Sequence, residues 1–375
     1  MWSKWSKIVI SDRLLASGTA TLSVSSLAVG TQTITAQYSG DSTWNATSRS
    51  TAVTVSQAST SALVSLTIAS GQLTLTAMVA PVAPGAGTPT GGVQFVNTSN
   101  NAVVASASLL GGKASAPVPA SVASTVMGQP IAAVYSGDGN FKGSTSAPLP
   151  AMVNAAANLS ASFADDEIVS LFGIAGLNGD TAATAPLTAS LGGVTVNIVD
   201  SAGTSRAALL YGVFASTGQI NLLVPSGTAA GLAVVTVTLP GGSTVTTVIE
   251  IANTAPGIFT ASMNGQGVYA GQVIYVQANG AQTVANSTVP ISLSTIGQQA
   301  YLVLYGTGIR HAGALTATVN GISVPVTYFG AQGTYAGLDQ INLGPLPASL
   351  AGAGTVNVVI SVDGQAANTV TVVIE

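Results

Sequence analysis

Side chains suited to acid–base or nucleophilic chemistry are scarce in this sequence of 375 residues, which has one histidine and no cysteine. His311 lies in a glycine-flanked segment, residues 306–313, that is typical of a surface loop. A catalytic triad also needs a serine on a strained turn and a carboxylate that orients the histidine, and no G-x-S-x-G motif is present. We therefore interpret His311 as a solvated loop residue and expect neither enzymatic activity nor a cofactor. Thiolate metal sites and disulfides are excluded because they need cysteine.

The acidic cluster Asp165-Asp166-Glu167 raises the question of calcium, which binds about six to eight oxygen atoms. Successive side chains of an extended strand point in opposite directions, so these three cannot all reach one ion. A calcium site between domains would need Asp180 or a backbone carbonyl as a further ligand, and that alternative stays open. We favour a solvated segment at the start of a domain, without a metal.

The motif YSGD occurs at residues 38–41 and again at residues 135–138, and an aromatic residue follows each copy at the same offset. An aspartate in such a turn usually accepts a hydrogen bond from the backbone two residues on, so we assign this structural role to Asp41 and Asp138. Tyr38 and Tyr135 end alternating strands, and we expect their rings to pack inside while their hydroxyls bind backbone.

A second repeat pairs Tyr211 with Tyr328, and after each tyrosine amide side chains lie on both sides of an isoleucine, with Gln219 and Asn221 in one copy and Gln340 and Asn342 in the other. Within a strand, both amides of a pair lie on the same face. Such a face can bind sugars, and it can also hydrogen-bond a long loop to the sheet. We favour the structural role, because aromatic residues, which a carbohydrate platform needs, make up only 5% of the chain.

Charge is scarce throughout the sequence, with 8 Lys+Arg, 12 Asp+Glu and a formal net charge of −4. Nucleic-acid binding needs a basic surface, so no nucleic-acid partner is expected. Hydrophobic residues make up 47% of the chain, but no window of ~20 apolar residues predicts a transmembrane segment. Residues 1–13 contain no apolar run long enough for a signal peptide. The surface must consist largely of neutral hydroxyls and amides, which can meet other protein surfaces without charge repulsion.

Apolar residues at every second position indicate short, half-buried β-strands, as in residues 73–79, 194–198 and 356–362. Glycine, asparagine and proline punctuate the strands, and strands of this kind predict all-β, Ig-like sandwiches of about 100 residues each. The YSGD copies are one such length apart, and each is followed by a Ser/Thr-rich strand, the second at residues 144–153. The sequence thus predicts three complete tandem sandwiches and one that is incomplete at its N-terminus. The expected domains are residues 1–56, 57–155, 156–253 and 254–375.

The YSGD copies, with their preceding strands and following aromatic residues, resemble the bacterial Ig-like repeats of large surface adhesins. The second half of the chain resembles the paired Ig-like C-terminal module of large secreted proteins of soil bacteria. One departure is Asp165-Asp166, where a turn of Pro-Gly type is expected. The resemblance implies an extracellular or cell-surface location and no chemistry. The residues that carry the second resemblance are Phe163-Ala164, residues 167–173, 191–194, 218–221, 255–259, 305–308 and 340–342.

The first hypothesis for function is therefore a non-enzymatic, secreted or surface protein that acts in structure or adhesion. The short first domain would expose a strand edge to which a strand of another copy can add, giving fibres. A truncated reading frame is the alternative explanation of its length. The second hypothesis is an accessory or carbohydrate-binding C-terminal region of a larger secreted enzyme. The expected partners are other protein surfaces, including further copies of the chain, and glycans in the second hypothesis.

Overall fold

The structure is a computed structural model that describes residues 16–24, 27–159 and 162–375. The predictions for residues 1–13 lie outside these described residues. In the described part of the chain, regular structure is β apart from two short 3-10 segments, Ala120–Thr125 and Ala348–Leu350, and the pairings between strands are antiparallel. The predicted all-β fold class of tandem Ig-like sandwiches is confirmed. No helix among these residues is long and apolar enough to cross a membrane.

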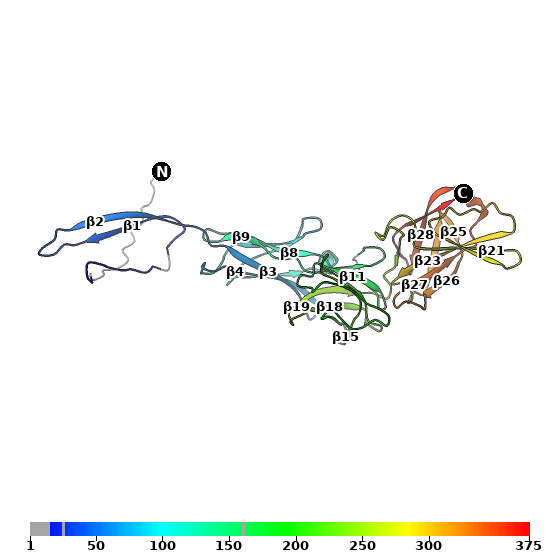
Figure 1. Cartoon of the computed structure of the whole chain (residues 1–375), viewed down its shortest axis with the longest axis horizontal. Coiled ribbons are helices and arrows are strands. Elements are labelled where there is room, and N and C mark those ends of the chain that lie inside the picture. The colour runs from blue at the N-terminus through cyan, green and yellow to red at the C-terminus, as the bar shows by residue number, and fades with distance from the viewer. Residues whose placement is uncertain (1–15, 25–26, 160–161) are drawn as a thin grey trace.

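Strands β1 (Gly30–Tyr38) and β2 (Thr47–Val55) form a two-stranded hairpin at one end of the elongated molecule (Figure 1). The YSGD turn connects these strands, and β2 is exposed along nearly its whole length. Trp44 beyond the motif is 70% exposed. The hairpin therefore buries little apolar surface of its own.

The second unit packs two antiparallel sheets face to face, with strand orders β3-β4-β7 and β6-β5-β8-β9. Its core contains the period-two set Leu73, Leu75, Ala77 and Val79 of β4, as the alternation predicts. The strands are β3 (Thr60–Ala69), β4 (Gln72–Pro81), β5 (Gly92–Asn97), β6 (Ala102–Ser108), β7 (Lys113–Val118), β8 (Ile131–Gly137) and β9 (Lys142–Thr145).

The third unit has sheets of order β10-β11-β17-β16-β12 and β13-β14-β18-β19, with β15 on β14. Val194, Val196 and Ile198 of β14 are buried between the sheets, while the residues that alternate with them are only partly buried. The strands are β10 (Ala151–Asn154), β11 (Ile168–Phe172), β12 (Asp180–Ala182), β13 (Ser190–Leu191), β14 (Val194–Val199), β15 (Ser205–Ala207), β16 (Leu209–Phe214), β17 (Gln219–Leu223), β18 (Gly231–Thr238) and β19 (Thr244–Ile251).

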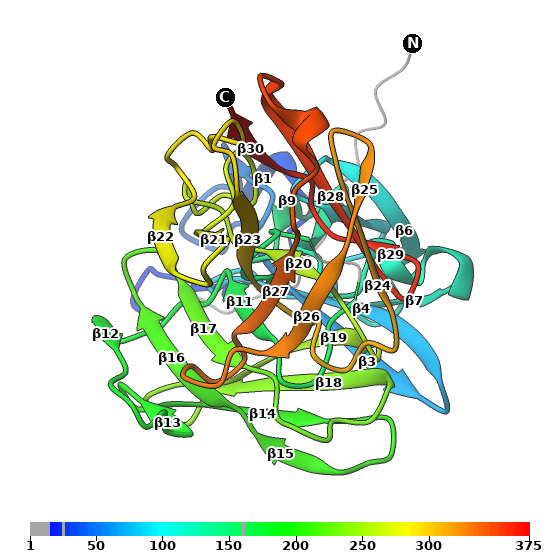
Figure 2. The same cartoon turned by 90° about the vertical axis from the view of Figure 1, so that its right-hand side faces the viewer.

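The fourth unit repeats this plan with sheets of order β22-β21-β23-β27-β26 and β25-β24-β28-β29, to which β20 and β30 add. It faces the viewer in Figure 2. The two-residue turn Asn320-Gly321, with positive φ at both residues, joins β24 to β25 as a type I′ hairpin requires. The strands are β20 (Gly257–Ile258), β21 (Gly271–Gln277), β22 (Gln282–Asn286), β23 (Gln298–Thr307), β24 (Leu315–Val319), β25 (Ile322–Val324), β26 (Val326–Ala331), β27 (Asp339–Leu343), β28 (Gly354–Val362), β29 (Gln365–Ala366) and β30 (Val370–Ile374).

One predicted strand is divided between two sheets. Residues 144–153 were expected to form a single strand of the second sandwich, but β9 ends at Thr145 and β10 pairs with β11 of the third sandwich. Pro148 and Pro150 lie between them, and proline cannot donate a ladder hydrogen bond. Residues 151–154 therefore belong to the next sheet, although we assigned them to the range 57–155.

The second and third sandwiches share apolar packing as well as a linker. Val248 of β19 is fully buried in the core of the second sandwich, and its carbonyl accepts a hydrogen bond of 2.8 Å from the Gly128 amide. Leu232 and Val234 of β18 pack against the same core. These contacts hold the two sandwiches together along the molecule.

The repeat between the third and fourth sandwiches differs by one residue from the alignment that the sequence suggested. We paired Tyr211 with Tyr328, but Gly212 faces Asn221 across the ladder where Tyr328 faces Asn342. A β-bulge lies at this place in both sandwiches, and Tyr211 is the extra residue of its strand. A bulge redirects a side chain, and the Tyr211 hydroxyl donates to the Ala336 carbonyl of the fourth sandwich.

Candidate functional site

Polar and charged side chains concentrate where the third sandwich meets the fourth. The Ile168 amide donates to the Thr307 hydroxyl over 2.8 Å, and that hydroxyl donates to the Gly337 carbonyl over 2.8 Å. The Asn154 side-chain amide donates to the Ala255 carbonyl over 3.0 Å. Thr307 and Asn154 are both buried. Buried polar groups are retained where they are hydrogen-bonded, so this junction is a built interface between the two sandwiches.

Backbone segments approach very closely here. A Cβ on Gly308, whose φ is +72°, would lie 2.2 Å from the Ala255 carbonyl oxygen. A Cβ on Gly337, with φ of +73°, would lie 2.4 Å from a Leu223 methyl group of the third sandwich. Only glycine fits such positions without displacement. Gly337 thus fits directly against the third sandwich, whereas the closest neighbour of Gly308 is Ala255 of its own sandwich, and Glu167 of the third sandwich comes next at 3.3 Å.

A buried ion pair anchors the loop that follows β23. The Arg310 guanidinium donates to the Asp339 carboxylate over 2.7 Å and to the Leu338 carbonyl over 3.1 Å. The Asp339 side chain is fully buried, and it also accepts hydrogen bonds from the amides of Ile309 and Arg310 at 2.8 and 3.2 Å. Burial raises the pKa of Asp339, while Arg310 and the amide donors oppose that shift.

Glu167 is fully buried at the same junction and does not point to solvent with its two acidic neighbours. One carboxylate oxygen accepts a hydrogen bond of 2.6 Å from the Ala164 amide. The other, Oε1, has no hydrogen-bond partner among the described residues. Burial raises the pKa of Glu167 well above its usual value, and the charge of Asp339 adds to the shift. Burial thus opposes ionisation of this carboxyl.

Asp165 and Asp166 lie across the junction from His311. The His311 Nε2 atom is 3.4 Å from Asp165 Oδ1 and 3.3 Å from Asp166 Oδ2. The three atoms that could bind a metal ion, one from each of these residues, all lie within 4.8 Å of one another. His311 is exposed, as expected for a loop residue, but it has two acidic neighbours contributed by the other sandwich. The sequence did not predict this contact, because about 145 residues separate His311 from the two aspartates along the chain.

The acidic residues considered for calcium are thus not one group. Asp165 and Asp166 share the junction with His311, whereas Glu167 is buried against the Ala164 amide. Asp180 instead accepts hydrogen bonds of 3.0 and 2.7 Å from the backbone amide and hydroxyl of Ser216. Those two donors lower the pKa of Asp180. The four carboxylates considered for calcium therefore face different partners.

The YSGD copies form the same turn in both places. Asp41 accepts hydrogen bonds from the amides two and three residues on, at 2.7 and 2.8 Å, and Asp138 does so at 2.8 and 2.9 Å. The Tyr38 hydroxyl donates to the Asp41 carboxylate over 2.6 Å, rather than to backbone as expected. The Tyr135 ring is buried, and its hydroxyl makes no hydrogen bond to backbone in the described residues. The second Asp138 oxygen instead receives the Thr90 amide and hydroxyl.

The amide pairs of the second repeat bond to each other within each strand. The Gln219 amide donates to Asn221 over 2.6 Å, and the Gln340 amide donates to Asn342 over 2.9 Å. The isoleucine between the members of each pair is fully buried. Asn221 also accepts from the Ser170 hydroxyl of the neighbouring strand over 2.9 Å. These hydrogen bonds lie within the sheet of each sandwich.

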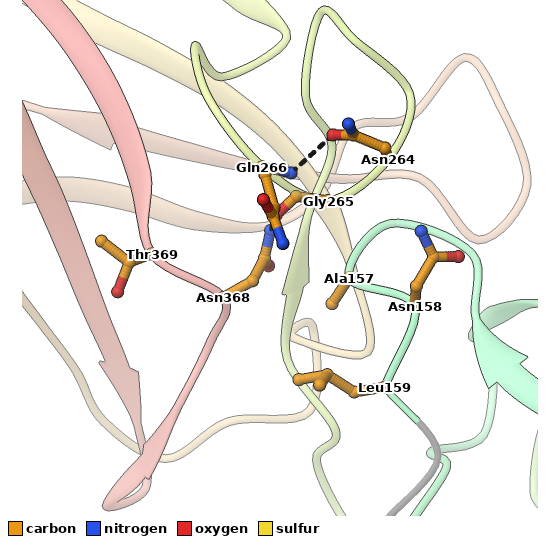
Figure 3. A pocket seen from close by; sticks show the side chains of 8 residues that line it. All are labelled: Ala157, Asn158, Leu159, Asn264, Gly265, Gln266, Asn368 and Thr369. Atoms are coloured by element: carbon orange, nitrogen blue, oxygen red, sulfur yellow. Dashed lines mark hydrogen bonds between the residues drawn. The ribbon is translucent and has the colours of Figure 1, made fainter. Parts of the chain in front are cut away.

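A pocket with a volume of ≈ 530 Å³ lies on another side of the junction (Figure 3). Asn158, Asn264 and Gln266 contribute amide side chains to it, and Leu159 contributes an apolar one. Asn368 also lines it, but its side chain is hydrogen-bonded to Ile258 and Gly265. No charged or aromatic side chain is among the eight lining residues, which are Ala157, Asn158, Leu159, Asn264, Gly265, Gln266, Asn368 and Thr369.

Sequence reasoning missed the residues that build the junction: Asn154, Tyr211, Thr307, Arg310 and Asp339. Asn154 and Thr307 carry common side chains in a Thr- and Asn-rich chain, so their types do not mark them. Arg310 did offer one, because it is one of only 8 Lys+Arg in the sequence and stands directly before the single histidine. Two rare charged residues in one loop mark a place where charge is needed.

Comparison with known proteins supports the fold of the first half of the chain. Residues 6–56 and 57–154 each match the family model of the bacterial Ig-like domain, group 3. No curated protein matches the chain significantly.

Several solved structures resemble the chain weakly. A mixed-linkage glucan utilization locus protein of Bacteroides ovatus, SGBP-B, in complex with a heptasaccharide, is 11% identical with a TM-score of 0.30, over 81% of this chain. The chain spans 63% of the length of that protein. A tetra-tandem repeat in the extending region of a large adhesion protein is 14% identical with a TM-score of 0.17, over 84% of this chain and 98% of the repeat. Murine CEACAM1b is 10% identical with a TM-score of 0.14, over 57% of this chain and 96% of its own. No functional conclusion follows from likeness this low.

Proposed function

We propose that this protein is a non-enzymatic, extracellular rod of tandem Ig-like sandwiches that serves in structure or adhesion at the bacterial surface. The observation that carries this proposal is the end-to-end arrangement of the units in an elongated molecule (Figure 1). The family match of residues 6–154 to bacterial Ig-like domains supports it. So does the surface, which carries few charged side chains to oppose contact with other protein surfaces.

The junction between the third and fourth sandwiches would keep the far end of this rod at a fixed angle. Hydrogen bonds from Asn154, Tyr211 and Ile168 cross it, and Gly337 lets the backbone of the fourth sandwich lie close to Leu223 of the third. Relative domain motion is the default where an interface is small and polar. Here the crossing groups are largely buried, which favours a stiff connection.

Small-angle X-ray scattering tests the rod. A compact chain of this length has a radius of gyration of about 21 Å, so the rod should exceed that value clearly, with a pair-distance distribution that has a long tail. Antibodies raised against the chain should label intact cells of the source bacterium. A radius of gyration near that of a compact chain, or labelling only after the cells are opened, would contradict the proposal.

Self-association into fibres is the finer form of this proposal. The hairpin β1–β2 has no further strand on either edge among the described residues, so a strand of another copy could extend it. Size-exclusion chromatography with light scattering, over a wide range of concentration, tests this step. The expected result for the full chain is a molar mass that grows with concentration. The chain without residues 1–56 should keep the mass of a monomer at every concentration. A monomer at high concentration would refute fibre formation while leaving the rod intact.

The alternative, a carbohydrate-binding accessory region, is favoured by one observation. The pocket at the junction is lined by neutral amides, which can bond to sugar hydroxyls. A glycan array with the intact chain, compared with Asn158→Ala and Gln266→Ala variants, tests it. Binding that the variants abolish would support the alternative, and a blank array would exclude it for the glycans present.

A further inference from the structure

We propose that Asp165, Asp166 and His311 form a binding site for a divalent transition metal of the zinc class, which ties the third sandwich to the fourth. The ligands come from two domains, with two carboxylates from the segment before β11 and one imidazole from the loop after β23. The inference does not depend on the extracellular role proposed above, because it concerns only the geometry of the junction.

His311 Nε2 and Asp166 Oδ2 lie within hydrogen-bond distance, and the separations between the ligand atoms are also those that a shared ion would set. His311 Nε2 lies 3.4 Å from Asp165 Oδ1 and 3.3 Å from Asp166 Oδ2. A charge-assisted hydrogen bond is shorter, about 2.7–2.9 Å. Tetrahedral zinc with bonds of about 2.0–2.1 Å to nitrogen and oxygen holds its ligands about 3.3–3.4 Å apart. Small rotations of the side chains would therefore suffice to surround an ion.

The imidazole decides the class of metal. Calcium and magnesium take oxygen ligands, whereas imidazole nitrogen suits zinc and its neighbours in the first transition row. Two carboxylates and one imidazole leave a fourth position for water on the solvent side, since the His311 side chain is 41% exposed and the two aspartates about half as much. An ion can therefore reach the site from solvent without opening the junction.

The surroundings orient the ligands before any ion arrives. Asp165 uses its other oxygen, Oδ2, to accept the Gly227 amide over 3.1 Å, which leaves Oδ1 toward His311. The Asp166 amide donates to the Val224 carbonyl over 3.0 Å, with φ of +57° at Asp166. Contacts beyond the ligands hold metal sites in shape in this way.

Arg310 does not bring a free positive charge into the site. Its guanidinium is bound to the Asp339 carboxylate and the Leu338 carbonyl, and this pair also fixes the loop that carries His311. The two aspartates, by contrast, place like charges close together, and a divalent cation relieves their repulsion.

Isothermal titration calorimetry on the full chain, without a histidine tag, tests the proposal with Zn²⁺ and separately with Ca²⁺. We expect one Zn²⁺ per chain and at least tenfold weaker binding of Ca²⁺. His311→Gln and Asp166→Asn should each weaken Zn²⁺ binding by tenfold or more. Asp180→Asn is the matched control, because it removes a carboxylate of the same sandwich that accepts hydrogen bonds from Ser216 and lies outside the proposed site, and it should leave the affinity unchanged.

A second measurement separates loss of ligands from loss of fold. Circular dichroism should show the same β-spectrum for every variant, and Co²⁺ bound to the unmodified chain should give the visible absorption of a tetrahedral site, which His311→Gln removes. Zn²⁺ should also raise the unfolding temperature of the unmodified chain, since a ligand of the native state stabilises it. Absence of Zn²⁺ binding, equal binding of Ca²⁺, or unchanged Zn²⁺ affinity in a folded His311→Gln variant would overturn the proposal.

Discussion

Replacing Arg310 with alanine should destabilise the fourth sandwich by about 3 kcal/mol, because it leaves a buried carboxylate without its cation. Removing one partner of a buried ion pair costs about 3–5 kcal/mol. Arg310 is 16% exposed, so water can reach part of the vacated space and the lower end of that range applies. Asp339 keeps two backbone donors on Oδ2 but loses the Arg310 donor on Oδ1, and the Leu338 carbonyl loses its guanidinium partner.

Hydrogen exchange followed by mass spectrometry measures this loss within the intact chain. A loss of about 3 kcal/mol corresponds to roughly 100-fold faster exchange of amides protected by unfolding of the fourth sandwich, at about 1.4 kcal/mol per factor of ten. Peptides that cover β23 and β27 should show it, and peptides of the second sandwich should not. The matched control is Arg49→Ala, which removes an exposed arginine of β2 and should leave exchange in the fourth sandwich unchanged.

The pH dependence of the variant gives a further check. The pKa of Asp339 is already raised by burial, and loss of Arg310 removes a charge that opposes this shift. In the folded variant the Asp339 carboxyl therefore holds its proton at a pH at which the unfolded chain has released it. The loss of stability caused by Arg310→Ala should consequently grow as pH rises from about 4 toward 7. Exchange rates that change less than threefold, or a loss that grows toward acid pH, would refute this account of the ion pair.

Three further predictions concern the YSGD turn and the junction. Hydrogen bonds from Thr90 and from backbone amides lower the pKa of Asp138. The stabilisation that its carboxylate provides is therefore present above the unfolded pKa of about 3.9 and is lost as pH falls below that value. In calorimetry below pH 4, the unfolding temperature of Asp138→Asn should fall less steeply with pH than that of the unmodified chain. Gly337→Ala should loosen the junction, because its Cβ would lie 2.4 Å from a Leu223 methyl group of the third sandwich and the positive φ costs about 1–2 kcal/mol. Limited proteolysis between the two sandwiches should become faster, and unchanged cleavage would contradict the close fit. Tyr211→Phe removes the hydrogen bond that crosses the junction and should cost about 1 kcal/mol; an unchanged unfolding temperature would count against its role.

Local pattern was enough to predict most of the fold. Alternation in β14 placed Val194, Val196 and Ile198 in the core, because a strand turns every second side chain to the same face. The Asp138 turn was also readable, since its donors lie two and three residues away in the sequence. Such features depend on neighbours along the chain, which the sequence contains directly.

Pairings that depend on how elements dock were not readable. The bulge lies at the same place in both sandwiches, with Tyr211 and Thr327 as the extra residues, so pairing Tyr211 with Tyr328 by residue type is off by one position. The expected strand at residues 144–153 was wrong for a related reason, because the choice of sheet for β10 depends on packing with β11.

The sequence by itself determined that this protein is a chain of β-sandwiches with neutral surfaces, almost no catalytic side chains and a repeated structural turn. Only the tertiary structure brought His311 to Asp165 and Asp166, which are separated from it by about 145 residues along the chain, and only it buried Glu167 away from its acidic neighbours. The physical reason is that strand periodicity is fixed by local backbone geometry. The contacts between sandwiches instead depend on how two separately folded units dock, as at the close fit of Gly337 against Leu223 and the hydrogen bonds from Asn154, Tyr211 and Ile168.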